Sequence, residues 1–191
     1  MVELSNLAAH FDAKYDVEPD PWRYRDSWYE RRKYAITVSC LPRPAYRAVW
    51  EPGCSIGELT VLLAARAERV DACDISRAAV FAARQRTADL PNVRVEQAAL
   101  PTCPPGASYD LVVLSEVLYY LDESDRDATL QRAEAAVEPG GDLVVVHWRH
   151  HPEDAWAAGE TVNDQVRHRP GWAPVVRHEE ADFVLDVLTR R

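Results

Sequence analysis

Apolar residues recur with two different periods along the middle of the chain. Short apolar runs at residues 47–51, 69–75 and 92–98 have the length and composition of strands. Between them, at residues 57–67 and 76–88, apolar positions repeat about every 3.6 residues, as they do on one face of a helix. This series predicts βαβ units that build a parallel sheet.

The second half of the chain continues the series. The near-continuous apolar stretch "YDLVVLSEVLYYL" at residues 109–121 predicts a strand in the middle of the sheet, covered on both faces. An amphipathic helix is expected over residues 122–137, closed by "EPGG", and a second buried strand is expected over residues 142–151.

The two ends of the chain differ from this core. In the polar and aromatic first 45 residues, Ser27 and Glu30 match a capping box, which predicts a helix over about residues 28–40. Residues 152–172 are a polar insertion with one short helix, and residues 174–191 contain two short strand-like runs that can pair antiparallel at a sheet edge.

Composition narrows the class of protein. With 191 residues the chain can bury one sizeable core, so we expect a single domain. The net charge of -9 argues against a nucleic-acid partner. The polar start and the absence of a long apolar run argue for a cytoplasmic protein without a membrane partner. Four cysteines are spread singly, so no metal site is expected: Cys40, Cys54, Cys73 and Cys103.

The stretch "VWEPGCSIGELT" at residues 49–60 predicts a strand, a glycine-bearing turn and the start of a helix, an arrangement that holds nucleotide-like cofactors. A dinucleotide fingerprint would need a small residue where this chain has Glu58, so a nicotinamide or flavin cofactor fits poorly. No G-K-[ST] follows, which excludes a Walker loop.

A cofactor with an ammonium group, a sulfonium and a ribose, but no phosphate, fits this turn better. Glu51 can attract the cationic part, and Gly53 and Gly57 permit close approach of the backbone. Asp74 ends the next strand 23 residues later, close to the spacing of a ribose-binding acid. These features predict S-adenosylmethionine as the cofactor.

Four segments resemble the successive motifs of class I S-adenosylmethionine-dependent methyltransferases: "EPGCSIGELT", "CDIS", "YDLVVLSEVLYYL" and "EPGGDLVVVHWRH". The aromatic lead "DPWRYRDSWYERRKY" narrows the resemblance to the nodulation protein S family of bacterial N-methyltransferases. The resemblance implies a Rossmann-like, doubly wound α/β fold with seven mostly parallel strands and an antiparallel edge strand. It also implies an N-terminal helical lid (1–45), a cofactor-binding core (46–150) and an insertion with a C-terminal strand pair (151–191).

The resemblance implies roles for further residues. Trp22, Tyr29 and Arg32 would form the lid, with Arg32 pairing with the methionine carboxylate of the cofactor. Strand-end loops would add contacts to the cofactor from Cys54, Ser55, Ile75, Gln97, Ala98, Ser115, Glu116 and Val117. Two departures stand out: Ser55 replaces the middle glycine of the family's glycine run, and Gln97 with Ala98 stand where many relatives carry an acid that holds the adenine.

The acceptor side is predicted from the ends of the fourth and fifth strands. Glu116 and His147 are the candidate catalytic groups, as a base for the amine or, for Glu116, as a partner of its ammonium form. The candidate acceptor-binding residues are Tyr119, Tyr120, Trp148 and Arg149. The leading hypothesis is N-methylation of an amino sugar or similar polar amine by a monomer or weak dimer. O-methylation, a non-catalytic cofactor-binding subunit and a nicotinamide enzyme remain as alternatives.

Overall fold

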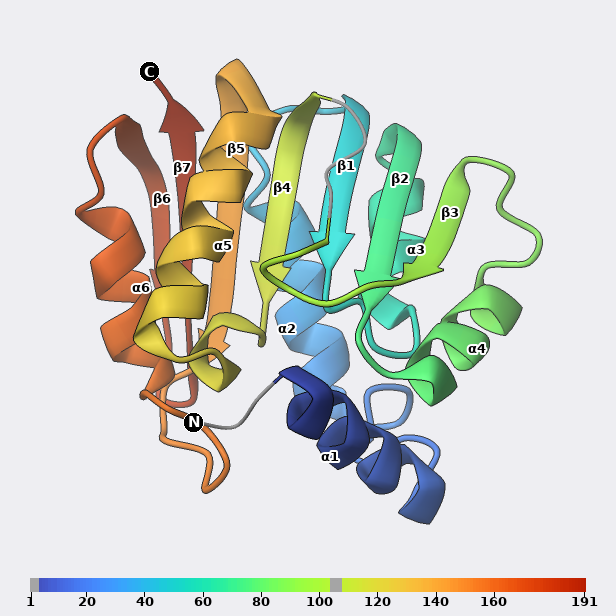
Figure 1. The fold of residues 1–191 in the computed structure, drawn as a ribbon. Coiled ribbons are helices and arrows are strands. Elements are labelled where there is room, and N and C mark those ends of the chain that lie inside the picture. Colours follow the sequence, from blue (N-terminus) through green and yellow to red (C-terminus); the bar gives the residue numbers. More distant parts are fainter. Residues whose placement is uncertain (1–3, 104–107) are drawn as a thin grey trace.

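The computed structural model describes residues 4–103 and 108–191, in which the strands form a single mixed sheet with helices around it (Figure 1). The strands are β1 (Tyr46–Pro52), β2 (Ala67–Asp74), β3 (Val93–Gln97), β4 (Tyr109–Ser115), β5 (Val137–Trp148), β6 (Trp172–Glu179) and β7 (Phe183–Arg190). The helices are α1 (Leu4–Val17), α2 (Trp28–Ser39), α3 (Glu58–Ala64), α4 (Arg77–Arg86), α5 (Glu123–Ala136) and α6 (Gly159–Arg167), with a 3-10 turn η1 (Leu118–Tyr120).

The described strands are arranged in the order β3-β2-β1-β4-β5-β7-β6. Neighbours from β3 to β5 run parallel, and β7 runs antiparallel to both β5 and β6. The prediction of a seven-stranded, mostly parallel α/β sheet is confirmed. The predicted C-terminal pair lies at the edge, although the antiparallel strand is β7, one position in from the edge strand β6.

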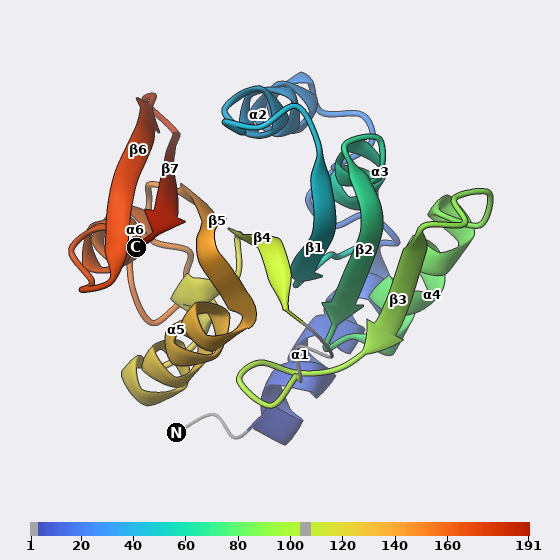
Figure 2. The ribbon, with the colours of Figure 1, turned by 90° about the horizontal axis from the view of Figure 1, so that it is seen from above.

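Helices cover both faces of the sheet: α2, α3 and α4 lie on one side, and α5 and α6 lie on the other (Figure 2). Successive residues of the central strands supply the two faces in turn. Leu111 and Val113 of β4 pack in the cluster that contains α3 and α4, whereas Val112 and Leu114 pack with α5 and α6. This explains why residues 109–115 read as a continuous apolar run.

Local sequence sets the starts of several helices. Ser27 accepts a hydrogen bond from the Glu30 amide, which confirms the predicted start of α2 at Trp28. The capping box is only half formed, because the Ser27 amide donates to the carbonyl of Arg23 and not to the Glu30 carboxylate. Ser76 and Asp122 cap α4 and α5 in the same way, by accepting from the amides of residues 79 and 125.

Some boundaries differ from the predictions. The strand expected over residues 109–121 ends at Ser115, because Glu116 has a φ of 57° and the chain turns into η1. The helix expected over 57–67 ends at Ala64. The "EPGG" segment lies inside β5, where the pairing with β4 changes register after Tyr109. Helix α1 was not predicted.

Helix α1 lies across the carboxyl ends of the parallel strands, below their arrowheads in Figure 1. These ends include β1 and β4, between which the order of strands along the chain reverses. Open α/β sheets bind their ligands at such a switch point. No helix in the described part of the chain is long and apolar enough to cross a membrane.

Candidate functional site

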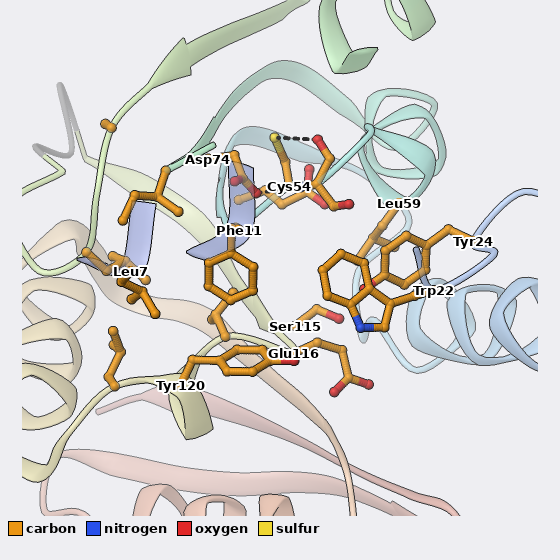
Figure 3. A pocket seen from close by; sticks show the side chains of 18 of the residues that line it. Leu7, Phe11, Trp22, Tyr24, Cys54, Leu59, Asp74, Ser115, Glu116 and Tyr120 are labelled. Carbon is orange, nitrogen blue, oxygen red and sulfur yellow. Dashed lines mark hydrogen bonds between the residues drawn. The ribbon is translucent and has the colours of Figure 1, made fainter. Parts of the chain in front are cut away.

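A pocket of about 870 Å³, including its open mouth, lies at the switch point (Figure 3). Its floor comes from the ends of β1, β2 and β4, and α1 with the segment that follows it forms a wall.

The turn after β1 brings the backbone to the floor of this pocket. Gly53 has a φ of 78°, and a Cβ there would lie 2.0 Å from Cγ1 of Val117, so no larger residue fits without displacing the Val117 side chain. The amides of Gly53 and Cys54 both donate to the carbonyl of Cys73, at 2.7 and 3.0 Å, which anchors the turn to the end of β2. Ser55, which replaces the family's glycine, adopts a φ of 50°.

Asp74 lines the pocket at the end of β2 and is 8% exposed. Its carboxylate accepts hydrogen bonds from the amides of Ser55, at 2.8 Å, and Ser76, at 2.9 Å. Burial raises the pKa of Asp74 to about 6, although these amides act in the opposite direction. The two amides thus hold the Asp74 carboxylate in place between the glycine-bearing turn and the start of α4.

Glu51 lines the same floor and is 3% exposed. Its Oε2 atom is buried and has no hydrogen-bond partner among the described residues. Burial raises the pKa of the Glu51 carboxyl to about 8. A buried carboxyl group with a free oxygen on a pocket floor is suited to a cationic ligand, whose charge would replace the lost hydration.

Glu116 lines the pocket from the opposite side, directly after β4. Its Oε1 atom accepts from Nζ of Lys33 at 2.5 Å, and its Oε2 atom accepts from the Tyr119 hydroxyl at 2.6 Å and from the Trp148 amide at 3.0 Å. Burial alone would raise the pKa of Glu116, but the positive charge of Lys33 and the hydrogen bonds from Lys33 and Tyr119 together hold the pKa below its usual value.

Aromatic rings form the wall that faces this floor (Figure 3). Phe11 of α1 meets Tyr120 edge to face, with ring centroids 5.0 Å apart. Trp22 stacks on Tyr24 with centroids 5.6 Å apart. Tyr15 places its hydroxyl 2.5 Å from Oγ of Ser55, which ties α1 to the glycine-bearing turn. Such a wall excludes water and offers flat faces to a ring-shaped ligand.

The structure brings together twelve of the residues predicted for the site. All of them line the pocket: Trp22, Glu51, Gly53, Cys54, Ser55, Asp74, Ile75, Ala98, Ser115, Glu116, Val117 and Tyr120. They come from segments that are up to about half of the chain apart in sequence, and all but Trp22 lie at or just after the carboxyl ends of parallel strands.

The predicted lid residues Tyr29 and Arg32 do not line the pocket. The guanidinium of Arg32 makes two hydrogen bonds to the carboxylate of Glu180, at 2.5 and 2.7 Å, so it is engaged by the β6–β7 turn instead of a cofactor carboxylate. The ring of Tyr29 packs edge to face on Phe183. Helix α2 therefore packs on the sheet, and α1 occupies the position expected of the lid.

His147 is fully buried at the end of β5 and does not line the pocket. Its Nε2 atom accepts from the Leu118 amide at 3.2 Å, and Nδ1 lies 2.7 Å from Oδ1 of Asn163, which can only accept. Burial lowers the pKa of His147 to about 4. The ring is thus neutral with both nitrogens occupied, and this geometry does not favour the predicted role of His147 as a base.

The other predicted residues outside the pocket lining have structural partners. Gly57 caps α3 with a φ of 85°, and the Gln97 side chain donates to the carbonyl of Ile75. The Tyr119 hydroxyl contacts Glu116, and the Trp148 ring packs against His150. Arg149 pairs with Glu160 and Glu179. Tyr119 therefore contacts the site through Glu116 and through the ring of Tyr120, whose centroid lies 4.6 Å away.

Sequence reasoning missed much of the apolar lining. The missed residues are Leu7, Phe11, Tyr15, Tyr24, Tyr34, Leu59, Leu100 and Leu121. A signal for three of them was present, because Leu7, Phe11 and Tyr15 follow at intervals of four residues and thus share one face of a helix. Lys33, which is buried behind Glu116, was also missed.

Comparisons with known proteins agree with this geometry. A methyltransferase domain family matches residues 49–141. A solved structure of a putative methyltransferase from Pseudomonas syringae is 43% identical, with a TM-score of 0.77, over 86% of this chain and 100% of that chain. The N-methyltransferase NodS of Bradyrhizobium japonicum WM9, solved with S-adenosyl-L-homocysteine, has a TM-score of 0.85 at 25% identity, over 95% of this chain and 97% of that one.

Nodulation protein S of Bradyrhizobium diazoefficiens is 29% identical over 148 residues, which are 75% of this chain and 71% of that protein. The chain spans about half the length of the other nodulation S proteins that it matches.

Proposed function

Because the chain belongs to the class I S-adenosylmethionine-dependent methyltransferases, we propose that it methylates the amine of a small polar molecule, such as an amino sugar. The observation that carries the binding of the methyl donor is the buried, unpartnered oxygen of Glu51 beside Asp74 on the floor of the pocket. The solved relatives with 25% or more identity include a putative methyltransferase and an N-methyltransferase, which supports the proposal.

The residues of the pocket fit S-adenosylmethionine. Glu51 would take the cationic amino group of its methionine part, and Asp74 would accept from the ribose hydroxyls. Gly53 allows the backbone to approach the ligand, and the apolar loop residues Ile75 and Ala98 would border the adenine. When bound, this cofactor supplies an electrophilic methyl group on a sulfonium.

The protein itself would contribute to methyl transfer by aligning the two reactants and excluding water from them. Helix α1 and its aromatic residues would cover the bound ligands, while Ser115, Glu116 and Val117 would line the acceptor side. Holding two reactants in line can contribute roughly 7–11 kcal/mol to lowering a barrier.

An amine acceptor and a hydroxyl acceptor differ in how they lose a proton before methyl transfer. Glu116 is held ionised by three donors, and both nitrogens of His147 are occupied, so neither side chain is suited to remove a proton. An amine can lose its proton to water and enter neutral, whereas a hydroxyl group needs a base in the site. The geometry therefore favours N-methylation over O-methylation.

The test is incubation with S-adenosylmethionine and a panel of primary amines that includes D-glucosamine, followed by mass spectrometry. N-acetyl-D-glucosamine is the matched control, since it keeps the hydroxyls and lacks the free amine. Methylation of the amines alone supports the proposal, and methylation of the N-acetyl control indicates an O-methyltransferase. Binding of S-adenosylhomocysteine without any methylated product indicates a non-catalytic subunit. Preferential binding of NAD contradicts the assignment of S-adenosylmethionine as the cofactor.

Domain number, oligomeric state and location in the cell are also part of what we propose for this protein. We expect one cooperative unfolding transition, as for a single domain, and a monomer or weak dimer in the cytoplasm that does not bind nucleic acid. Size-exclusion chromatography over a range of protein concentrations and cell fractionation test these expectations, and a constant dimer mass at high dilution would contradict the monomer.

A further inference from the structure

Lys33 is a buried cation on α2, with only 2% of its surface exposed. Its Nζ lies 2.5 Å from Oε1 of Glu116 and 2.9 Å from Oε2 of Glu30. Lysine is almost never fully buried unless it is paired, because desolvation of the ammonium group is costly. Removal of either partner of such a pair is strongly destabilising, so the arrangement restricts α2 to one position relative to the pocket.

Glu116 stands where four segments meet. Its carboxylate receives hydrogen bonds from α2 through Lys33, from η1 through the Tyr119 hydroxyl and from the end of β5 through the Trp148 amide. Its own amide donates to the carbonyl of Val146 at 2.8 Å. The side chain therefore fixes the place where the chain leaves β4 and enters the pocket wall.

The backbone at this place is strained. Glu116 has a φ of 57°, in the left-handed region that residues other than glycine rarely adopt, and such a conformation persists only where surrounding contacts enforce it. The next residue, Val117, is placed so close to Gly53 that no Cβ fits there. The strained residue thus sets the gap between the acceptor side and the cofactor side of the pocket.

We infer that Lys33 is a positioning residue for methyl transfer: by pairing with Glu116 it holds residues 115–117 in the conformation that aligns the acceptor. This inference rests on the proposed function, since it names the group that supports the acceptor side of that same site. Lys33 itself does not line the pocket, so it acts through Glu116.

The charges around Glu116 make the role of Lys33 measurable. The ionisable groups that influence Glu116 or are influenced by it are Glu30 and Lys33 of α2, His147 of β5, and Tyr24, Tyr29, Tyr34, Tyr119 and Tyr120. Lys33 is the permanent cation among them. Without it, the largest influence that opposes burial is removed, and the pKa of the Glu116 carboxyl rises.

The experiment compares Lys33→Met, Lys33→Arg, Glu116→Gln and the double variant Lys33→Met/Glu116→Gln. Arg47→Met is the matched control, because it removes an ion pair with Glu138 at the start of β1, the opposite edge of the sheet from the pocket. The carboxyl carbons of ¹³C-labelled glutamate are followed by NMR against pH, and Glu116→Gln identifies the Glu116 resonance. Turnover is measured with the amine that the wild type methylates, and the affinity for S-adenosylhomocysteine is measured by calorimetry.

We expect Lys33→Met to lower kcat about tenfold to a hundredfold, as misalignment of reactants does, with little change in cofactor affinity. The Glu116 carboxyl then titrates at higher pH than in the wild type, and Lys33→Arg restores both properties in large part. In the double variant the neutral pair recovers thermal stability while kcat stays low. A purely structural role of Lys33 predicts instead that kcat recovers together with stability.

An unchanged Glu116 titration in Lys33→Met, or a kcat equal to that of Arg47→Met, overturns the inference. A wild type that methylates no amine contradicts the proposed function instead. In that case the carboxyl titration still decides whether Lys33 holds Glu116, and an unchanged titration overturns the inference as before.

Discussion

Among single residues, Glu51 links the binding of a ligand in the pocket to the loss of a proton from its own carboxyl group. In the free protein burial raises the pKa of its carboxyl to about 8, so most molecules carry it protonated at pH 7. A ligand with an ammonium group favours the ionised form. We therefore predict that binding of S-adenosylhomocysteine at pH 7 releases about one proton per protein molecule.

Calorimetric titration in two buffers with different heats of ionisation measures this proton. Glu51→Gln is the control, since it keeps the shape of the side chain and has no proton to release. Identical binding heats for the wild type in both buffers would contradict the assignment of Glu51 to the cationic part of the cofactor.

Asp74 gives a second prediction at this scale. Asp74→Ala removes an oriented carboxylate from the floor of the pocket, and each hydrogen bond to such a charged group is worth about 1.5–3 kcal/mol. We expect the Kd for S-adenosylhomocysteine to rise by at least about tenfold, measured by calorimetry. Glu96→Ala, which removes an exposed acid from neighbouring β3, should leave Kd unchanged. An equal Kd for both variants would reject the role of Asp74.

At the scale of elements, α1 and α2 are held in different ways. Helix α1 contacts loops around the pocket through isolated polar pairs: Tyr15 with Ser55, Asp12 with Ser76, and Lys14 with Asp154. Helix α2 instead buries Lys33, Tyr34 and Thr37 and begins at a capped serine. A helix that covers a ligand site loses much of its support when the ligand is absent.

We predict that limited proteolysis cleaves residues 4–27 faster without S-adenosylhomocysteine than with it, and that α2 resists cleavage in both samples. The fragments are identified by mass spectrometry, with NAD as a control ligand that should give no protection. Equal rates of cleavage before residue 28 with and without S-adenosylhomocysteine would count against a covering role of α1.

At the scale of the whole molecule, His147 joins the centre of the sheet to α6. Its neutral ring bonds to the Leu118 amide and to Asn163, and Asn163 donates to the carbonyl of Val145 and to Asp186 of β7. Burial lowers the pKa of His147 to about 4, from about 6.5 when unfolded. The unfolded chain therefore binds more protons between these pH values, and stability falls as pH falls from about 6.5 toward 4.

We predict that the free energy of unfolding contributed by His147 falls by about 2 kcal/mol between pH 7.5 and pH 5. Urea unfolding of the wild type and of His147→Gln at both pH values measures this contribution as the difference between the two proteins. The comparison with His147→Gln is needed because Glu51 acts in the opposite direction. The pKa of Glu51 is raised in the folded protein, so its contribution to the free energy of unfolding falls as pH rises. The same pH dependence in both proteins would show that His147 does not titrate on unfolding.

The parallel strands of the sheet and the residues on the floor of the pocket could be predicted from the amino-acid pattern alone. The order of strands and helices follows from short-range periodicity, and residues that end parallel strands must meet at one edge. Glu51, Gly53, Asp74 and Ser115 could therefore be assigned to a common site before any distance was known. The fold predicted in this way is confirmed, and so is the family that the sequence motifs resemble.

Only the tertiary structure decided which charged and aromatic side chains meet across the molecule. Arg32 and Glu180 are 148 positions apart and Lys33 and Glu116 are 83 apart, so no local pattern shows that they pair. The burial of His147 depends on Asn163 of α6, and the use of α1 as a wall depends on where that helix docks. Periodicity specifies which face of an element is buried, whereas the partner of a buried charge is set by the packing of distant elements, which also sets its ionisation.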